Sequence, residues 1–201
     1  MTPEQLSANL NRVRSEINTE YPQWANVALG NTALAMLKDR VVNKGISPDG
    51  SAYNPYSTKP ILVGAKSFRT KAAADSIFGS KTKRKAADWR TITRGGTNYR
   101  LILLPGGYKR IRQIEGSQVA HKSFLRSGEM WLSIHTLGTR KEGGGFTTTV
   151  GTEVELSNKK LEGNTKRENK EILMVSKSEE TRLTEILDKY ITNKLNRAFN
   201  G

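Results

Sequence analysis

Two histidines and a group of carboxylates are the side chains of this sequence best suited to acid–base or metal chemistry. His121 and His135 have no second ligand one helical turn away, so a metal site would need partners distant in sequence. The carboxylates of this group alternate with lysines, as on a solvated helix face. The group consists of Glu153, Glu155, Glu162, Glu168, Glu171, Glu179 and Glu180. We therefore expect neither paired catalytic carboxylates nor a metal site.

Nucleophile and phosphate-loop motifs are also missing from the sequence. The chain has no cysteine, which excludes disulfides, thiolate metal sites and cysteine nucleophiles. The glycine-containing segments 105–109 and 143–145 lack the spacing and the terminal Lys-Ser/Thr of a P-loop. No serine lies in a nucleophile elbow. We expect a protein that is not an enzyme and has no catalytic residue, no cofactor and no metal.

The net charge of +14 is concentrated in the middle of the 201-residue chain. Residues 64–100 carry ten basic and two acidic side chains, a net charge of +8. Residues 105–141 carry seven basic and two acidic side chains, a net charge of +5. Residues 1–63 have six basic and five acidic side chains, and from residue 142 onward ten of each cancel. The two ends are therefore close to neutral.

The densest basic cluster could bind a polyanion. It consists of Lys81, Lys83, Arg84 and Lys85, followed by the aromatic residues Trp89, Tyr99 and Tyr108. Cations of this kind neutralise phosphates and aromatic rings stack on bases, so one hypothesis is a nucleic-acid-binding protein that uses residues 64–112. The alternative is a solvated arm or a docking surface for an acidic protein. Neither a groove-reading helix nor an RNA-binding signature accompanies the cluster.

Helices are predicted at both ends of the chain. Thr2 and Gln5 form a capping box around Pro3 at the start of a helix, and the apolar period of that helix ends at Tyr21-Pro22. A second helix is expected over residues 22–43, with Gly45 closing it. At the other end, Ser178 is expected to cap a helix that follows the 3.6-residue period to about residue 199.

The centre of the chain predicts strands and loops. Residues 100–104 have the pattern of a short buried strand, and residues 124–137 that of a short helix leading into a strand. The β-branched residues around Gly151 predict a strand pair in the segment FTTTVGTEVEL. Residues 45–60 predict an ordered loop with a turn at Pro48-Asp49-Gly50. Residues 108–122 are expected to be a polar linkage.

These elements predict an α+β fold. N-terminal and C-terminal helices would pack on a small, mostly antiparallel sheet in a single domain, residues 1–201. Residues 61–120 would form a long basic insertion or arm within it, with one short helix near residues 71–78. No run approaches the roughly 20 apolar residues of a membrane-spanning helix, and the N-terminus lacks the apolar core of a secretory signal, so we expect no membrane association.

Three separated segments resemble the virion-morphogenesis and tail-completion proteins of tailed bacteriophages, a family of the neck and head–tail junction. The turn at residues 45–50, followed by Tyr53 and Tyr56, is similar to that family's G-x-x-P-D-G turn. Residues 125–134 (LRSGEMWLSI) resemble its L-x-[ST]-G-x-L-x-x-S-I segment, and residues 172–176 (ILMVS) resemble the segment that precedes its C-terminal helix. The order of the three segments agrees, although a longer, basic stretch separates the first two here.

The resemblance implies a structural virion protein that forms a homo-oligomeric ring at the head–tail junction, through which genomic double-stranded DNA passes. Its implied partners are copies of itself and the portal, connector and tail proteins, and its assembly in the bacterial cytoplasm involves no membrane. The residues expected to contact subunits or partners are Pro48, Asp49, Gly50, Tyr53, Tyr56, Lys81, Lys83, Arg84, Lys85, Gly128 and Met174.

The expectations for the basic residues 81–85 and for Gly128 each depend on a physical requirement. A channel in which DNA slides should not be lined by dense positive charge, so we expect the four basic residues 81–85 to face neighbouring subunits or acidic partners. Gly128 is central to the second segment if that segment needs a positive φ or a close backbone approach. The alternative is an ordinary flexible glycine.

Overall fold

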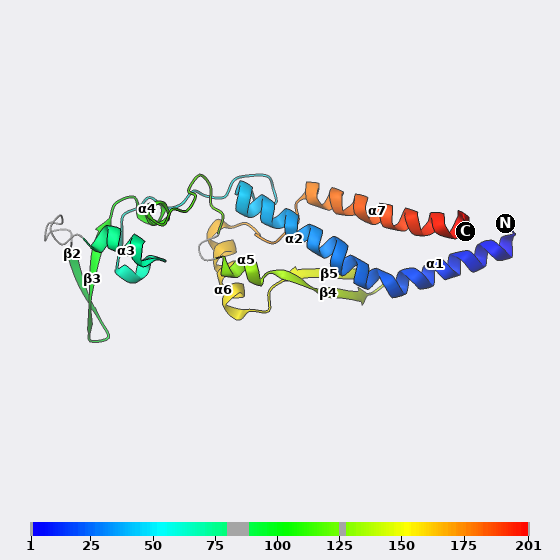
Figure 1. Cartoon of the computed structure of the whole chain (residues 1–201), viewed down its shortest axis with the longest axis horizontal. Coiled ribbons are helices and arrows are strands. Elements are labelled where there is room, and N and C mark those ends of the chain that lie inside the picture. The colour runs from blue at the N-terminus through cyan, green and yellow to red at the C-terminus, as the bar shows by residue number, and fades with distance from the viewer. Residues whose placement is uncertain (1, 80–88, 125–127, 201) are drawn as a thin grey trace. The chain divides into compact units, whose positions relative to one another are not determined.

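The computed structural model describes residues 2–79, 89–124 and 128–200, and the chain divides into two compact units. The first unit joins Met1–Ala52 to Ser123–Gly201, and the second is Tyr53–Lys122. The fold class is α+β, as predicted, with helices at both ends and small antiparallel sheets between them (Figure 1). The expected basic insertion, residues 61–120, lies within the second unit.

The first unit begins with one long helical segment. Helix α1 spans Pro3–Trp24 and α2 spans Asn31–Lys38, and each is followed by a π-helical turn, Ala25–Gly30 and Asp39–Lys44. The predicted capping box of Thr2 and Gln5 is confirmed. Gly45 closes the segment in the left-handed conformation, as predicted, with φ 67°. Neither this segment nor any other helix in the described ranges is long and apolar enough to cross a membrane.

The predicted helix break at Tyr21-Pro22 is wrong, because Pro22 lies inside α1. Aromatic packing on both sides of the proline holds this part of the helix. The ring of Tyr21 lies 5.7 Å from that of Trp24, and Trp24 stacks at 4.0 Å on Tyr190 of the C-terminal helix. We infer that this packing outweighs the cost of one missing helical hydrogen bond and of the crowded proline ring.

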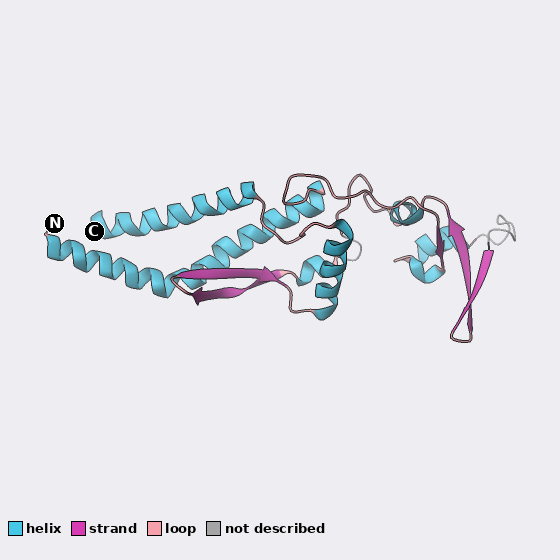
Figure 2. Cartoon of the chain, turned by 180° about the vertical axis from the view of Figure 1, so that it is seen from behind, coloured by secondary structure: helices cyan, strands magenta, loops and turns pink. Residues whose placement is uncertain are grey.

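The C-terminal helix α7 (Lys177–Asn200) packs against α1 and α2 (Figures 1 and 2). Lys194 forms ion pairs with Glu16, at 3.5 Å, and with Glu20. The predicted cap is two residues off: Ser176, rather than Ser178, caps the helix. Its Oγ accepts a hydrogen bond from the Glu179 amide at 3.3 Å, and the Glu179 carboxylate accepts one from the Ser176 amide at 2.7 Å.

A two-stranded hairpin packs against the long helical segment. Strand β4 (His135–Glu142) pairs with β5 (Gly145–Gly151), and both contact the first π-helical turn. Gly30 permits this contact, because a Cβ at that position would lie 2.5 Å from Thr136 Cγ2. A strand lies in the segment FTTTVGTEVEL, as predicted, but the predicted strand pair around Gly151 is wrong: β5 ends at Gly151 and pairs with β4 across a turn at Gly143-Gly144.

Two helices flank the hairpin. Helix α5 (Glu129–Ser133) leads into β4, as predicted for that region. Helix α6 (Glu155–Glu168) replaces the second half of the predicted strand pair, so that prediction is wrong beyond residue 154. Ser133 Oγ, at the end of α5, donates a hydrogen bond to Ser157 Oγ of α6 at 2.9 Å. This long-range polar contact positions a helix whose own sequence has little apolar periodicity.

The second unit has its own sheet and its own core. Strands β1 (Ile61–Val63), β2 (Trp89–Arg94) and β3 (Thr97–Leu104) form an antiparallel sheet in the order β1-β3-β2. Helix α3 (Lys71–Phe78) lies where a short helix was predicted. Helix α4 (Gly107–Ile114) occupies part of the predicted polar linkage, which is therefore wrong. The core residues are Val63, Phe68, Ala73, Ala74, Leu104 and Ile111.

Candidate partner-contact site

The turn of the first resemblance segment is held by a network of short-range hydrogen bonds. The Gly50 amide donates to Ser47 O at 3.0 Å, and the Ser47 amide donates to Ser51 O at 2.8 Å. The Asp49 carboxylate accepts from the Ser51 amide at 2.8 Å, from Ser51 Oγ at 2.6 Å and from Ser47 Oγ. Gly50 has φ 83°, a conformation that favours glycine. The turn is thus rigid, and its Pro48-Asp49-Gly50 tip is well defined.

These hydrogen bonds make the turn sensitive to acid. Donation from Ser47 Oγ, Ser51 Oγ and the Ser51 amide holds the pKa of Asp49 well below its ordinary value of 3.8. A carboxyl with a lowered pKa contributes stability above its unfolded-state pKa, and this contribution is lost as protons bind at lower pH. We expect the free energy of unfolding of the Asp49→Asn variant to converge on that of the unmodified chain as pH falls below about 4.

Urea denaturation of both proteins between pH 7 and pH 2 measures this convergence. Ser51→Ala, which removes one donor and leaves the carboxylate, should give an intermediate pH dependence. Parallel stability curves for Asp49→Asn and the unmodified chain would show that the turn does not act through this carboxylate.

Behind the turn lies a buried arginine that joins three parts of the first unit. Arg40 Nε donates to Glu179 Oε1 at 3.0 Å, Nη1 donates to Ile46 O at 3.1 Å, and Nη2 donates to Met174 O at 2.7 Å. Both charged side chains are about nine-tenths buried. Because Glu179 also bonds the Ser176 amide, the ion pair connects the long helical segment, the turn and the start of α7.

The arginine brings together two of the three resemblance segments, which are more than 120 positions apart in sequence. Ile46 belongs to the first segment, and Met174 and Ser176 belong to the third. A groove of about 950 Å³ runs beside them. Its walls include Pro48, Asp49 and Gly50 of the turn, the cap residue Ser176 and residues 177–179 of α7. The Met174 side chain, 60% exposed, lies next to this junction while its carbonyl is bound from inside by Arg40.

Gly128 of the second segment has φ 82° and precedes α5. Residues 125–127 of that segment lie outside the described ranges.

A side chain in the left-handed region costs about 1–2 kcal/mol, so Gly128→Ala should lower the free energy of unfolding by about that amount. Gly163→Ala, inside α6 with no atom within 4 Å of the added Cβ, should instead raise it by about 0.5–1 kcal/mol. Thermal and urea denaturation distinguish the two signs, and equal effects would contradict the strained role of Gly128.

The remaining expected contact residues lie in the second unit. Tyr53 and Tyr56 are 4% and 7% exposed. The Tyr56 ring lies 5.7 Å from that of Tyr108, and the Arg112 guanidinium lies 5.3 Å from the Tyr56 ring centroid. Tyr56 therefore packs within the unit, and the expected role of both tyrosines in partner contact stays a prediction. Lys81, Lys83, Arg84 and Lys85 lie outside the described residues.

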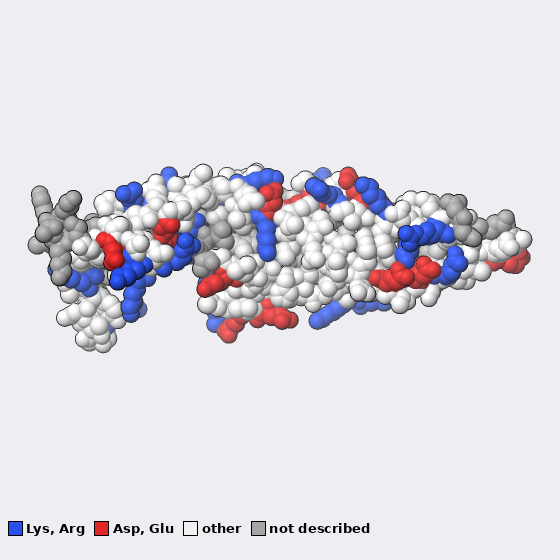
Figure 3. All heavy atoms as spheres, viewed as in Figure 1, with Lys and Arg blue, Asp and Glu red and all other residues white. Residues whose placement is uncertain are grey.

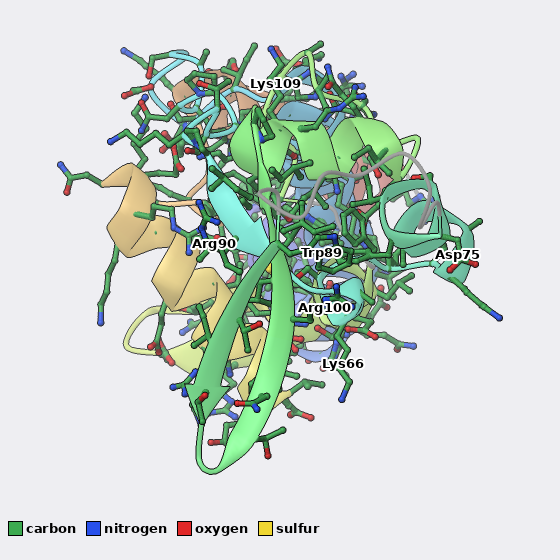
Figure 4. All side chains as sticks on the ribbon, turned by 90° about the vertical axis from the view of Figure 1, so that its left-hand side faces the viewer. Lys66, Asp75, Trp89, Arg90, Arg100 and Lys109 are labelled. Atoms are coloured by element: carbon green, nitrogen blue, oxygen red, sulfur yellow. The ribbon has the colours of Figure 1, made fainter. Side chains whose placement is uncertain are left out.

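The second unit carries most of the charge of the protein. Residues 53–122 contain fifteen Lys or Arg and three Asp or Glu, a net charge of +12, which leaves +2 for the first unit. Basic atoms predominate over acidic ones on the part of this unit in view in Figure 3. Arg100 stacks over Trp89, with Cζ 4.3 Å from the ring centroid, and both point to the side of β2 opposite Arg90 (Figure 4).

The structure also places the side chains considered for catalysis. His135 Nδ1 lies 2.9 Å from Ser133 O, and the His121 amide donates to the Gln118 side chain at 3.3 Å. Among the described residues, no group of three His, Asp or Glu could hold a metal ion. Glu179 serves the buried ion pair and the α7 cap instead.

Sequence reasoning missed Arg40 and the role of Glu179. The signal for Glu179 is present locally, because Ser176 and Glu179 have the S-x-x-E spacing of a capping box. Arg40 has no such signal: its partner lies 139 positions away.

Comparison with protein-family models, with curated proteins and with solved structures finds no match for this chain.

Proposed function

We propose that this chain is a structural virion protein of a tailed bacteriophage, without catalysis, that forms a ring at the head–tail junction through which double-stranded DNA passes. The observation that carries the proposal is the meeting of two resemblance segments at Arg40. Segments matched independently in sequence would be expected to share one site if they share one function. The G-x-x-P-D-G turn and Ser176 of the ILMVS segment line one groove.

The same groove suggests how the chain contacts its partners. The rigid turn and the first residues of α7 line the groove, and the exposed Met174 lies two residues before Ser176, which also lines it. In the proposed ring these residues contact the neighbouring copy or the portal, connector and tail proteins. The near-neutral charge of the first unit suits packing between identical subunits, since like charges of high density would repel.

Inactivation of the reading frame in the genome that encodes it tests the proposal. We expect electron microscopy of the lysate to show DNA-filled heads and separate tails, with joined particles restored by a plasmid copy. Met174→Asp should fold, because the side chain is largely exposed, but should fail to restore joined particles. Leu156→Asp, at an equally exposed leucine on α6, is the matched control and should restore them. Normal infectious particles without the protein would overturn the proposal.

A second candidate function is binding of nucleic acid through residues 64–112. The observation that favours it is the excess of fifteen cations over three carboxylates in the second unit. Titration of a labelled DNA duplex over a salt series separates the candidates. A complex that survives moderate salt would favour nucleic-acid binding as the function. Weak binding with a steep salt slope is what any protein of this charge gives, and would favour the structural role.

A further inference from the structure

One face of the three-stranded sheet in the second unit is apolar, although none of the described core residues of that unit lies on it. Cross-strand partners share a face, and the register pairs Leu62 with Leu103, Arg90 with Leu101, and Ile92 with Tyr99. We call this surface the leucine face. It consists of Leu62, Arg90, Ile92, Arg94, Thr97, Tyr99, Leu101 and Leu103. The opposite face supplies Val63, Ile102 and Leu104 to the interior.

The leucine face is unusually apolar for a sheet face that is exposed to solvent. An antiparallel sheet with one solvated face normally alternates apolar inward and polar outward residues. Here the outward positions Leu62, Ile92, Tyr99 and Leu103 are 42%, 40%, 46% and 47% exposed. Four half-exposed large apolar side chains on adjacent strands form a contiguous patch, and such patches mark interaction surfaces.

All charged residues of the leucine face are basic. Arg90 and Arg94 lie on it with no Asp or Glu at any of its positions. Figure 4 shows Arg90 on the opposite side of β2 from Trp89 and Arg100. The face is therefore apolar with a cationic margin, inside a unit of net charge +12.

We propose that the leucine face binds an acidic amphipathic helix of another protein. A helix is the element that covers an open sheet face, its apolar stripe would bury the leucines, and its carboxylates would meet Arg90 and Arg94. The same face of a second copy would bring two units of +12 together, which disfavours self-association. Nucleic acid is disfavoured because aliphatic side chains give bases no stacking surface and only one aromatic residue, Tyr99, lies on the face. The inference does not depend on the head–tail role.

Fluorescence anisotropy with the full chain tests the inference. The probe is a synthetic helix of about 20 residues with leucines on one face and glutamates on the other, compared with a peptide of the same composition in scrambled order. At about 150 mM salt, where surface charge is screened, the amphipathic peptide should bind at least about 10-fold more tightly than the scrambled one. Leu103→Asn and Tyr99→Asn should each weaken its binding by about 10-fold. Leu132→Asn, at a more exposed leucine of the first unit, should leave it unchanged.

Circular dichroism tests whether each variant is folded. Because Leu103 and Tyr99 are about half exposed, we expect both variants to retain the fold. Equal binding of the two peptides would overturn the inference, because charge alone would then explain it. Unchanged binding by both variants would also overturn it. Dimerisation of the unmodified chain that Leu103→Asn abolishes would assign the face to a second copy. Tighter binding of a 20-bp DNA duplex than of the peptide, weakened by both Leu103→Asn and Tyr99→Asn, would assign it to nucleic acid. None of these results alters the expected head–tail phenotype.

Discussion

Replacement of Arg40 by methionine is expected to lower the free energy of unfolding of the first unit by about 3–5 kcal/mol, since it leaves the Glu179 carboxylate buried without its counter-charge. The carbonyls of Ile46 and Met174 lose their donors in the same variant. Urea denaturation followed by far-ultraviolet circular dichroism measures the change.

The matched control for this variant is Arg12→Met. Arg12 and Glu16 form an ion pair at 3.9 Å on the exposed face of α1, where solvent screens the charges, so its loss should change stability by less than about 1 kcal/mol. A conservative Arg40→Lys variant retains the charge but cannot reach three acceptors with the same planar fork, and should fall between the two. If Arg40→Met and Arg12→Met have similar effects, the buried ion pair does not hold the turn and α7 together.

The second large effect is expected at Gly107, where α4 begins. Gly107 has φ 56°, and a Cβ there would lie 2.2 Å from Lys59 O and 2.9 Å from Ser57 O. Both neighbours are backbone atoms, and the Lys109 amide also bonds Ser57 O at 3.0 Å, so the loop cannot give way without losing that bond. Gly107→Ala should therefore destabilise the second unit by about 3 kcal/mol or more, from backbone strain and overpacking together.

Hydrogen exchange followed by mass spectrometry locates this loss, because the amides of β3 and α4 should exchange faster while those of α1 and α7 do not change. Gly116→Ala is the control, with φ 67° and no atom within 4 Å of the added Cβ. It tests strain without a clash and should cost about 1–2 kcal/mol. Equal effects of the two substitutions would show that the close approach to residues 57–59 contributes nothing.

The terminal helices and their closing residues could be predicted because their signals are local. Thr2 and Gln5 are three positions apart, Gly45 follows directly on the helix that it closes, and α7 has a regular apolar period. The α+β class followed from these helices and from strands with β-branched residues. The tip of the Pro48-Asp49-Gly50 turn could be predicted for the same reason.

The parts that escaped prediction depend on contacts between distant residues. Helix α6 has a charged sequence with little apolar periodicity, and it meets the end of α5 through the hydrogen bond between Ser133 and Ser157, which are 24 positions apart. Pro22 remains helical because Tyr190 packs on Trp24 from the other end of the chain. The candidate site could be predicted only in part. Its turn could be recognised in the sequence, but the contact of Arg40 that joins the turn to Met174 could not.

The two π-helical turns between Pro3 and Gly45 have a consequence for how the length of this segment can vary in evolution. A π-helical turn holds about one residue more than an α-helical turn, and each residue advances the helix by about 100°. Deletion of one residue within Ala25–Gly30 would remove this extra residue and restore α-helical hydrogen bonding, while the residues on either side of the turn would keep their faces, so that Glu16 would still face Lys194. A one-residue change of length, which would rotate the flanking part of a regular α-helix by about 100°, can therefore be absorbed at these turns by a switch between π-helical and α-helical geometry.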